Sequence, residues 1–143
     1  MKEVVNVFVT DLEHGQFVAV RRISNDKYFP GMLALPGGGI ETGESIEEAA
    51  KREFHEETGI ELSEVGEVII ETPLSVLGTT LNITVVGGKI VSDHFSPIDK
   101  DITETRWVRA SEFLESLDKS GYPTTEVEKF RIFLMKSGFQ VDQ

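Results

Sequence analysis

Cysteine is absent from the 143 residues of this sequence, and there are only five prolines and one tryptophan. The absence of cysteine excludes disulfide bonds, thiolate metal sites and a cysteine nucleophile. No apolar run approaches the roughly 18 residues that a membrane-spanning helix needs. The first residues lead into a short strand-like run, with no long apolar segment and no cleavage site of a signal peptide. We therefore expect a soluble, cytoplasmic protein without a membrane partner.

Positive charge is also scarce. The chain has 14 lysines and arginines against 25 aspartates and glutamates, which gives a formal net charge of −11. A field of this sign repels the backbone of nucleic acids. An anionic small-molecule substrate would need local compensation by a metal ion or by a few arginines. We expect such a substrate and no nucleic acid partner.

The length suits one domain, residues 1–143, with a sizeable core. Runs rich in β-branched and aromatic residues predict strands at 4–10, 16–22, 80–85 and 106–108. Gly87-Gly88 fits either a hairpin turn or a bulge inside a longer strand. Near the end of the chain, Ser111 is expected to cap one helix, and Thr125 with Glu128 a second. This mixture predicts an α/β or α+β fold with a sheet between helices.

A further helix is predicted between residues 45 and 58. Ser45 is a good N-cap, Glu48 completes a capping box, and Gly59 suits the left-handed position that ends a helix. A helical wheel gives two faces. The apolar face is expected to hold Ile46, Ala49, Ala50 and Phe54, and the opposite face Glu47, Glu48, Lys51, Arg52, His55 and Thr58.

Three glutamates break the pattern of this helix. Glu53, Glu56 and Glu57 fall within the apolar face or at its edge, where neighbouring carboxylates repel one another and burial adds a desolvation cost. Positive charge has to lie among them. Arg52 can supply part of it, and a hard divalent cation would supply the rest. The alternative is a solvated acidic face that binds nothing.

These residues and their spacing resemble the Nudix box. The signature is a glycine, five residues, a glutamate, seven residues, then Arg-Glu-apolar-x-Glu-Glu-x-Gly-apolar. Every fixed position is filled, by Gly38, Glu44, Arg52, Glu53, Phe54, Glu56, Glu57, Gly59 and Ile60. The preceding Leu35-Pro36-Gly37-Gly38 also resembles the lead-in of the family. The resemblance implies the Nudix fold, a mixed sheet sandwiched between helices.

The resemblance also implies roles for individual residues. Mg²⁺, with Mn²⁺ as a possible substitute, would be held by Glu53, Glu56 and Glu57 together with a backbone carbonyl of Gly37 or Gly38. Arg52 would orient a glutamate, and Glu44 would fix the loop to the helix.

A further acidic residue outside the box is expected by the same resemblance. We expect it at Asp101, with Asp99 and Glu104 as competitors. Either Glu53 or Asp101 would accept a proton from the attacking water.

Three residues outside the box are open to a functional or a structural interpretation. Arg21 and Arg22 end the second strand near the Pro-Gly loop, and they either bind phosphate or form an ordinary solvated pair. Trp107 could stack on a base, although a tryptophan in a strand is more often part of the core.

The leading functional hypothesis is a MutT-like enzyme that hydrolyses a nucleoside triphosphate to a monophosphate and pyrophosphate. The alternative is a pyrophosphatase for ADP-ribose or a nucleoside diphosphate sugar, for which Pro73 is an ambiguous sign. A non-catalytic nucleotide sensor is the third hypothesis, and the intact box argues against it. An isomerase of isopentenyl diphosphate is disfavoured by the absence of cysteine. A homodimer is possible, since Nudix proteins frequently dimerise.

Overall fold

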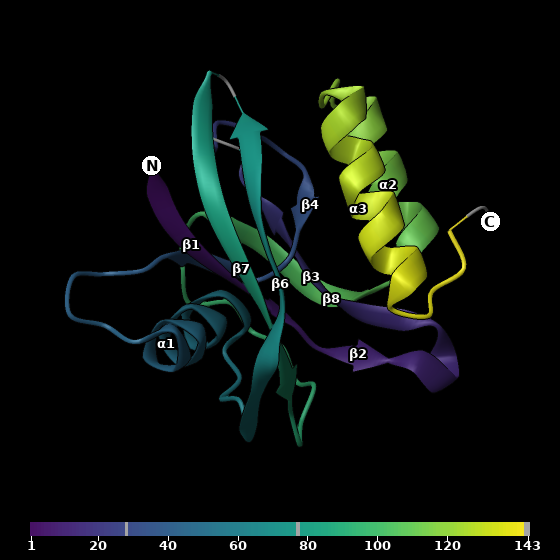
Figure 1. Ribbon diagram of the computed structural model, residues 1–143. Helices are drawn as coiled ribbons and strands as arrows, with labels where there is room; N and C mark the ends of the chain where they lie inside the picture. Colours follow the sequence, from purple (N-terminus) through teal and green to yellow (C-terminus); the bar gives the residue numbers. More distant parts are fainter. Residues whose placement is uncertain (28, 77, 142–143) are drawn as a thin grey trace.

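The computed structural model describes residues 1–27, 29–76 and 78–141. Figure 1 shows how its strands and helices are arranged. The strands are β1 (Lys2–Phe8), β2 (Thr10–Asp11), β3 (Gln16–Arg22), β4 (Leu33–Ala34), β5 (Gly37–Gly39), β6 (Glu64–Val76), β7 (Thr79–Lys89) and β8 (Ile102–Val108). The helices are the 3-10 turn η1 (Leu12–His14), α1 (Ile46–Thr58), α2 (Ala110–Lys119) and α3 (Thr124–Lys136).

The strands form two sheets. The first has the order β5-β1-β7-β6, in which β1 and β7 are parallel and the other pairs are antiparallel. In the second, β3 pairs with β2, β4 and β8, all antiparallel. Helix α1 lies on one side of the strands, and α2 and α3 lie together on the other (Figure 1). The expected mixed sheet between helices is thus confirmed.

Strand β1 is buried on both faces, and this places it at the centre of the molecule. Val5 and Val7 pack with Phe54 of α1 in one apolar cluster. On the opposite face, Val4 and Phe8 belong to the larger cluster, which includes residues of α2 and α3. Alternate side chains of a strand point to opposite faces, so Asn6 falls on the same face as Val4 and Phe8.

Several strands differ from the sequence-based expectation. The strand predicted at 4–10 is interrupted at Val9, where the chain leaves the first sheet and β2 joins β3. Strand β6 was not anticipated, and β8 begins at Ile102 rather than at residue 106. Gly87 and Gly88 lie inside β7, so a hairpin turn there is wrong. A side chain at Gly88 would press against Leu62 and Val7.

The expected caps of the last two helices are wrong. Helix α2 already begins at Ala110, whose side chain is buried, and no side chain caps it. Helix α3 follows Pro123, and the Pro123 carbonyl accepts hydrogen bonds from the N–H groups of Glu126 and Val127. Ser111 and Thr125 therefore lie within the first turns, two residues beyond the N-cap positions at Arg109 and Pro123.

Helix α1 matches its expected bounds. The Ser45 hydroxyl accepts from the N–H of Glu48 at 3.0 Å, and the Glu48 carboxylate accepts from the N–H of Ser45 at 2.9 Å. Gly59 ends the helix with a φ of 75°. Thr58 was expected on the polar face but is buried, and its hydroxyl donates to the carbonyl of Phe54 at 2.7 Å. Ile46, expected on the apolar face, is 38% exposed.

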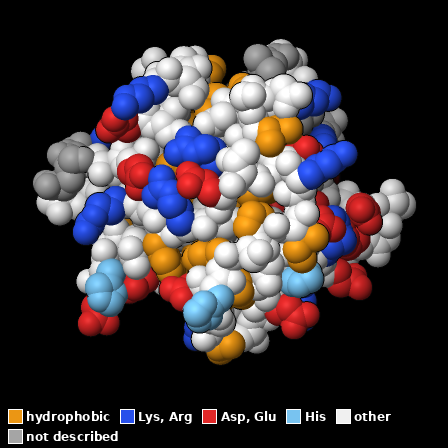
Figure 2. Space-filling view, turned by 180° about the vertical axis from the view of Figure 1, so that it is seen from behind, with side chains coloured by type: hydrophobic (Ala, Val, Ile, Leu, Met, Phe, Trp, Pro, Cys, Tyr) orange, Lys and Arg blue, Asp and Glu red, His pale blue; other side chains and the backbone are white. Residues whose placement is uncertain are grey.

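Charges of opposite sign are mixed on one face of the molecule. On the face drawn in Figure 2, acidic and basic side chains lie next to each other rather than in separate patches. No helix in the described part of the chain is long and apolar enough to cross a membrane.

We expect Gly59→Ala to destabilise the protein more than Gly43→Ala. Both glycines have positive φ, which costs about 1–2 kcal/mol for alanine. A Cβ at Gly43 meets open space, whereas one at Gly59 would overlap the carbonyl of Ser96. Urea unfolding should show that the free energy of unfolding falls by about 1 kcal/mol in Gly43→Ala and by about 2–4 kcal/mol in Gly59→Ala. Equal losses in the two variants would show that the backbone at Ser96 moves aside at little cost.

Candidate active site

A cavity of about 310 Å³ lies beside the glycines of β5. One group of its lining residues is polar and largely acidic, and we call this group the acidic end: Arg22, Gly37, Gly38, Glu53, Glu57 and Asp99. A second group belongs to the larger apolar cluster or packs against it, and we call it the apolar end: Phe29, Leu35, Leu81, Ile83, Phe113 and Phe130. The cavity therefore joins two chemically different regions.

Glu57 is the most deeply buried of the three glutamates, with 1% of its surface exposed. Arg22 donates two hydrogen bonds to its carboxylate, of 2.8 and 3.3 Å, and the N–H of Gly37 donates a third at 3.0 Å. Arg22 also donates to the carbonyl of Gly37 at 3.0 Å. Burial raises the pKa of Glu57 to about 7, although Arg22 and the Gly37 N–H act in the opposite direction.

Arg52 connects the loop before α1 to the glutamates of the helix. It donates to both carboxylate oxygens of Glu44, at 2.7 and 2.9 Å, and to Glu53 at 2.8 Å. The same guanidinium reaches the carbonyl of Gly39 at 3.1 Å and an oxygen of Glu56 at 3.4 Å. The hydrogen bonds from Arg52 lower the pKa of Glu44 to about 2. Burial raises the pKa of Glu53, against the effect of Arg52.

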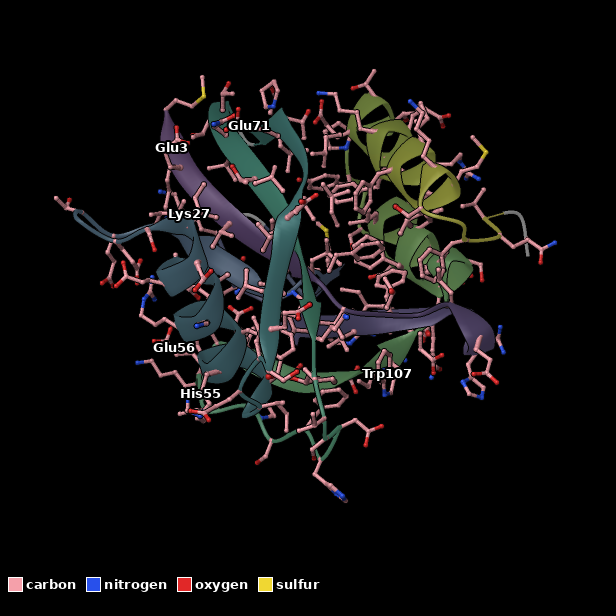
Figure 3. The ribbon with its side chains drawn as sticks, turned by 60° about the horizontal axis from the view of Figure 1, so that its bottom comes forward. Glu3, Lys27, His55, Glu56, Glu71 and Trp107 are labelled. Atoms are coloured by element: carbon pink, nitrogen blue, oxygen red, sulfur yellow. The ribbon has the colours of Figure 1, made fainter. Side chains whose placement is uncertain are left out.

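Glu56 occupies a more open position. Its side chain is 42% exposed, compared with 12% for Glu53 and 2% for Glu57. Figure 3 places Glu56 and His55 on the outer side of α1. Among the described residues, no three acidic or histidine side chains are gathered closely enough to form a ready-made metal site. The carboxylates here pair with arginines and do not gather around one common point.

The donor atoms nevertheless fit a hard divalent cation. The acidic end of the cavity offers only oxygen ligands, which are the carboxylates of α1 and the carbonyls of β5. A Cβ on Gly38 would lie 2.6 Å from the Glu53 carboxyl group, so only glycine lets the backbone approach this close. The arrangement suits the Mg²⁺ expected from the sequence.

The structure does not bring Asp101 into this cavity. Asp99, named as a competitor, lines it instead, and its backbone N–H donates to the carbonyl of Glu56 at 2.8 Å. The N–H of Asp101 donates to the Asp99 carboxylate at 2.8 Å, which places Asp101 behind it. Spacing in the sequence does not show which of two aspartates, only two residues apart, lines the cavity.

Arg21 and Arg22 lie on opposite sides of β3, as neighbouring residues of a strand must. Only Arg22 lines the cavity. Arg21 donates to Glu104 at 2.9 Å and to the carbonyl of Gly31 at 3.0 Å, beside a separate surface hollow. Arg22 thus remains a candidate to contact phosphate, whereas Arg21 and Glu104 pair with each other away from the cavity.

Trp107 does not contribute to the cavity. It lies on β8 (Figure 3) and packs against the apolar cluster that contains Phe54 of α1. Its indole N–H donates to Asp93 at 2.9 Å, and its ring packs edge-on against Phe95.

Sequence reasoning missed other cavity residues. Lys2 and Asn6 line the cavity from β1, and Lys27 and Phe29 line it from the loop between β3 and β4. Asn6 carried a signal, because it is a polar residue in a strand of β-branched and aromatic residues.

The comparisons with known proteins agree with this geometry. The family model of the NUDIX domain matches residues 2–127, so the chain belongs to the Nudix hydrolase family. The expected class of enzyme, a hydrolase of phosphoanhydride bonds, is thereby confirmed at the level of the family.

Individual relatives match either part of the sequence or the fold. The nucleoside triphosphatase NudI of Salmonella heidelberg (strain SL476) is 48% identical over 48 residues, which is 34% of this chain and 34% of that protein. The chain thus matches about a third of the length of such curated relatives.

Two solved structures share the fold over nearly the whole chain. The MutT protein of Methanosarcina mazei Go1 has a TM-score of 0.74 at 24% identity, covering 97% of this chain and 96% of that one. A NUDIX hydrolase from Nitrosomonas europaea also has a TM-score of 0.74, at 23% identity, covering 98% and 91%.

We expect Glu57→Gln to leave the free energy of unfolding of the metal-free protein at pH 8 unchanged or higher, because the raised pKa of Glu57 means that burial costs its ionised carboxylate more than Arg22 and the Gly37 N–H return. Urea unfolding at pH 8 in the presence of a chelator measures this. A loss of about 1–3 kcal/mol would mean that the pair with Arg22 outweighs the cost of burial.

The Glu44–Arg52 pair should make stability depend on pH. Because the pKa of Glu44 is lower in the folded protein than its usual 4.5, the folded chain binds fewer protons between the two values. The contribution of the Glu44–Arg52 pair to the free energy of unfolding is therefore complete above pH 4.5 and is lost as the pH falls toward 2. Between neutral pH and about pH 3, Glu44→Gln should lose less stability than the wild type.

A control for this comparison is Glu47→Gln. Glu47 pairs with Lys51 at 3.3 Å, but both side chains are more than half exposed, so we expect the wild-type pH profile. A Glu44→Gln profile that matched the wild type would contradict the proposed effect of Arg52.

Proposed function

We propose that the protein is a Mg²⁺-dependent pyrophosphohydrolase, which converts a nucleoside triphosphate to a nucleoside monophosphate and pyrophosphate. The observation that carries this proposal is the cavity with an acidic, glycine-lined end and an apolar, aromatic end. The acidic end suits cations and phosphates, and the apolar end suits a planar ring. The partial similarity to a nucleoside triphosphatase supports a triphosphate substrate.

The residues that would hold Mg²⁺ are Glu53, Glu56 and Glu57, with a carbonyl of Gly37 or Gly38. When bound, the ion neutralises phosphate charge and lowers the pKa of water. Asp99 lines the same cavity, and we assign to it the role of the acidic residue outside the box that was expected at Asp101. The net charge of −11 makes local compensation of this kind necessary for an anionic substrate.

The side chains of the cavity divide the remaining tasks. Glu53 accepts the proton of the attacking water, and its raised pKa favours that transfer. The water oxygen bonds to phosphorus as the bridging bond between the α- and β-phosphates breaks, and pyrophosphate leaves. Arg52 orients Glu53 through the hydrogen bond of 2.8 Å. Arg22 places positive charge in the wall of the cavity.

The alternative substrates have less support. Pro73, the possible sign of an ADP-ribose enzyme, lies in β6, and its carbonyl accepts from Lys129 at 3.3 Å. It is not among the residues that line the cavity. Hydrolysis of ADP-ribose or a sugar nucleotide would release two monophosphates rather than pyrophosphate, so the products distinguish the two activities.

We expect pyrophosphate release from at least one nucleoside triphosphate when Mg²⁺ is present, and none when it is chelated. In the same assay, Glu53→Gln should lower kcat/KM by about 10²-fold or more, since it removes the proton acceptor. His55→Gln is the matched control, because His55 is an exposed neighbour on the outer side of α1.

A second readout does not need turnover. Mg²⁺ should raise the melting temperature of the wild type, because the ion binds the folded state. Inactivity toward every triphosphate, or equal activity after chelation, would contradict the proposed function.

A further inference from the structure

Asn6 is a polar side chain in an otherwise apolar stripe. Val4 and Phe8, two residues before and after it, belong to the larger core cluster, together with Leu35 and residues of α2 and α3. A polar group at such a position lowers stability unless it makes hydrogen bonds. In residues 1–27, 29–76 and 78–141, no protein group is hydrogen-bonded to the Asn6 amide side chain.

The backbone around Asn6 fixes where its amide lies. Asn6 is paired with Gly37 of β5 on one side and with Val85 of β7 on the other. A Cβ on Gly37 would be 2.5 Å from the Asn6 side-chain oxygen. The amide therefore packs directly over Gly37, which also contacts Arg22 and Glu57 at the acidic end of the cavity.

A second hollow meets the active-site cavity at this point. It has a volume of about 360 Å³ and lies between β6, β7 and α3. Both spaces are lined by Asn6, and they share the apolar walls formed by Leu35, Ile83 and Phe130. Asn6 thus presents a donor and an acceptor where apolar and aromatic walls converge, beside the region suited to phosphate.

We propose that Asn6 determines the base specificity of the enzyme by hydrogen-bonding to the edge of the nucleobase. A carboxamide offers one donor and one acceptor side by side, and it pairs with a base edge that presents the complementary groups. Leu35, Ile83 and Phe130 hold the plane of the ring. This inference rests on the proposed function, because it assumes a nucleotide in the cavity.

The test is the spread of kcat/KM over the four bases, measured with Mg²⁺ for ribo- and deoxyribonucleoside triphosphates. We expect Asn6→Leu to reduce the ratio between the best and the worst base by about tenfold or more, the discrimination that a two-bond contact provides. Asn6→Asp keeps the shape but only accepts hydrogen bonds, so it should change the ranking of the bases.

Asn82→Leu is the matched control. Asn82 lies on the adjacent strand β7, and its amide donates to Glu3 at 2.8 Å and to Glu71 at 3.4 Å, outside both hollows. We expect the wild-type ranking of bases in this variant. An equal loss for all bases in Asn6→Leu, or a change only in the preference for ribose over deoxyribose, would overturn the inference.

Two further measurements keep the outcome unambiguous. Asn6→Leu should melt at or above the wild-type temperature, because an apolar side chain suits the stripe; a lower melting temperature would assign Asn6 a structural role. Binding of the four nucleoside monophosphates, measured by calorimetry, repeats the comparison without turnover. If the wild type hydrolyses no triphosphate but binds monophosphates with an Asn6-dependent ranking, the proposed function fails while this inference stands.

Discussion

Two arginines allow α1 to present its glutamates to the cavity. A buried carboxylate without a cationic partner costs several kcal/mol, and Glu57 has only 1% of its surface exposed. Arg22 meets this requirement from β3, in the second sheet, while its other hydrogen bond holds Gly37 of β5, in the first. Within the box, Arg52 is the cationic partner of Glu53 and Glu44. The placement of α1 against both sheets depends on these pairs.

Sequence reasoning succeeded where the deciding interactions are local. The bounds of α1 follow from Ser45, Glu48 and Gly59, which act on neighbouring backbone groups. It failed where distant segments decide. Glu57 and Arg22 are 35 residues apart, and nothing in the spacing indicates their pairing. Strand β6 exposes Val68, Ile69 and Ile70, so it lacks the alternation that identifies a half-buried strand.

The two ends of the cavity come from different parts of the chain. The acidic end is built largely from one continuous segment, which is also the segment that identifies the family. The apolar end is assembled from the residues that flank β4, from β7 and from the last two helices, which are distant in sequence. Under the proposed function, the family signature and the contacts to the ring of the substrate therefore come largely from different segments of the chain.

The segment between β7 and β8 closes the carboxyl end of α1. The N–H of Ser96 donates to the carbonyl of Thr58, and those of Ile98 and Asp99 both donate to the carbonyl of Glu56. The same segment carries Asp99 into the cavity. Although this segment has no regular secondary structure, these hydrogen bonds attach it to the last turn of α1. Loop exchange between related enzymes would thus have to transfer this connection and α1 together.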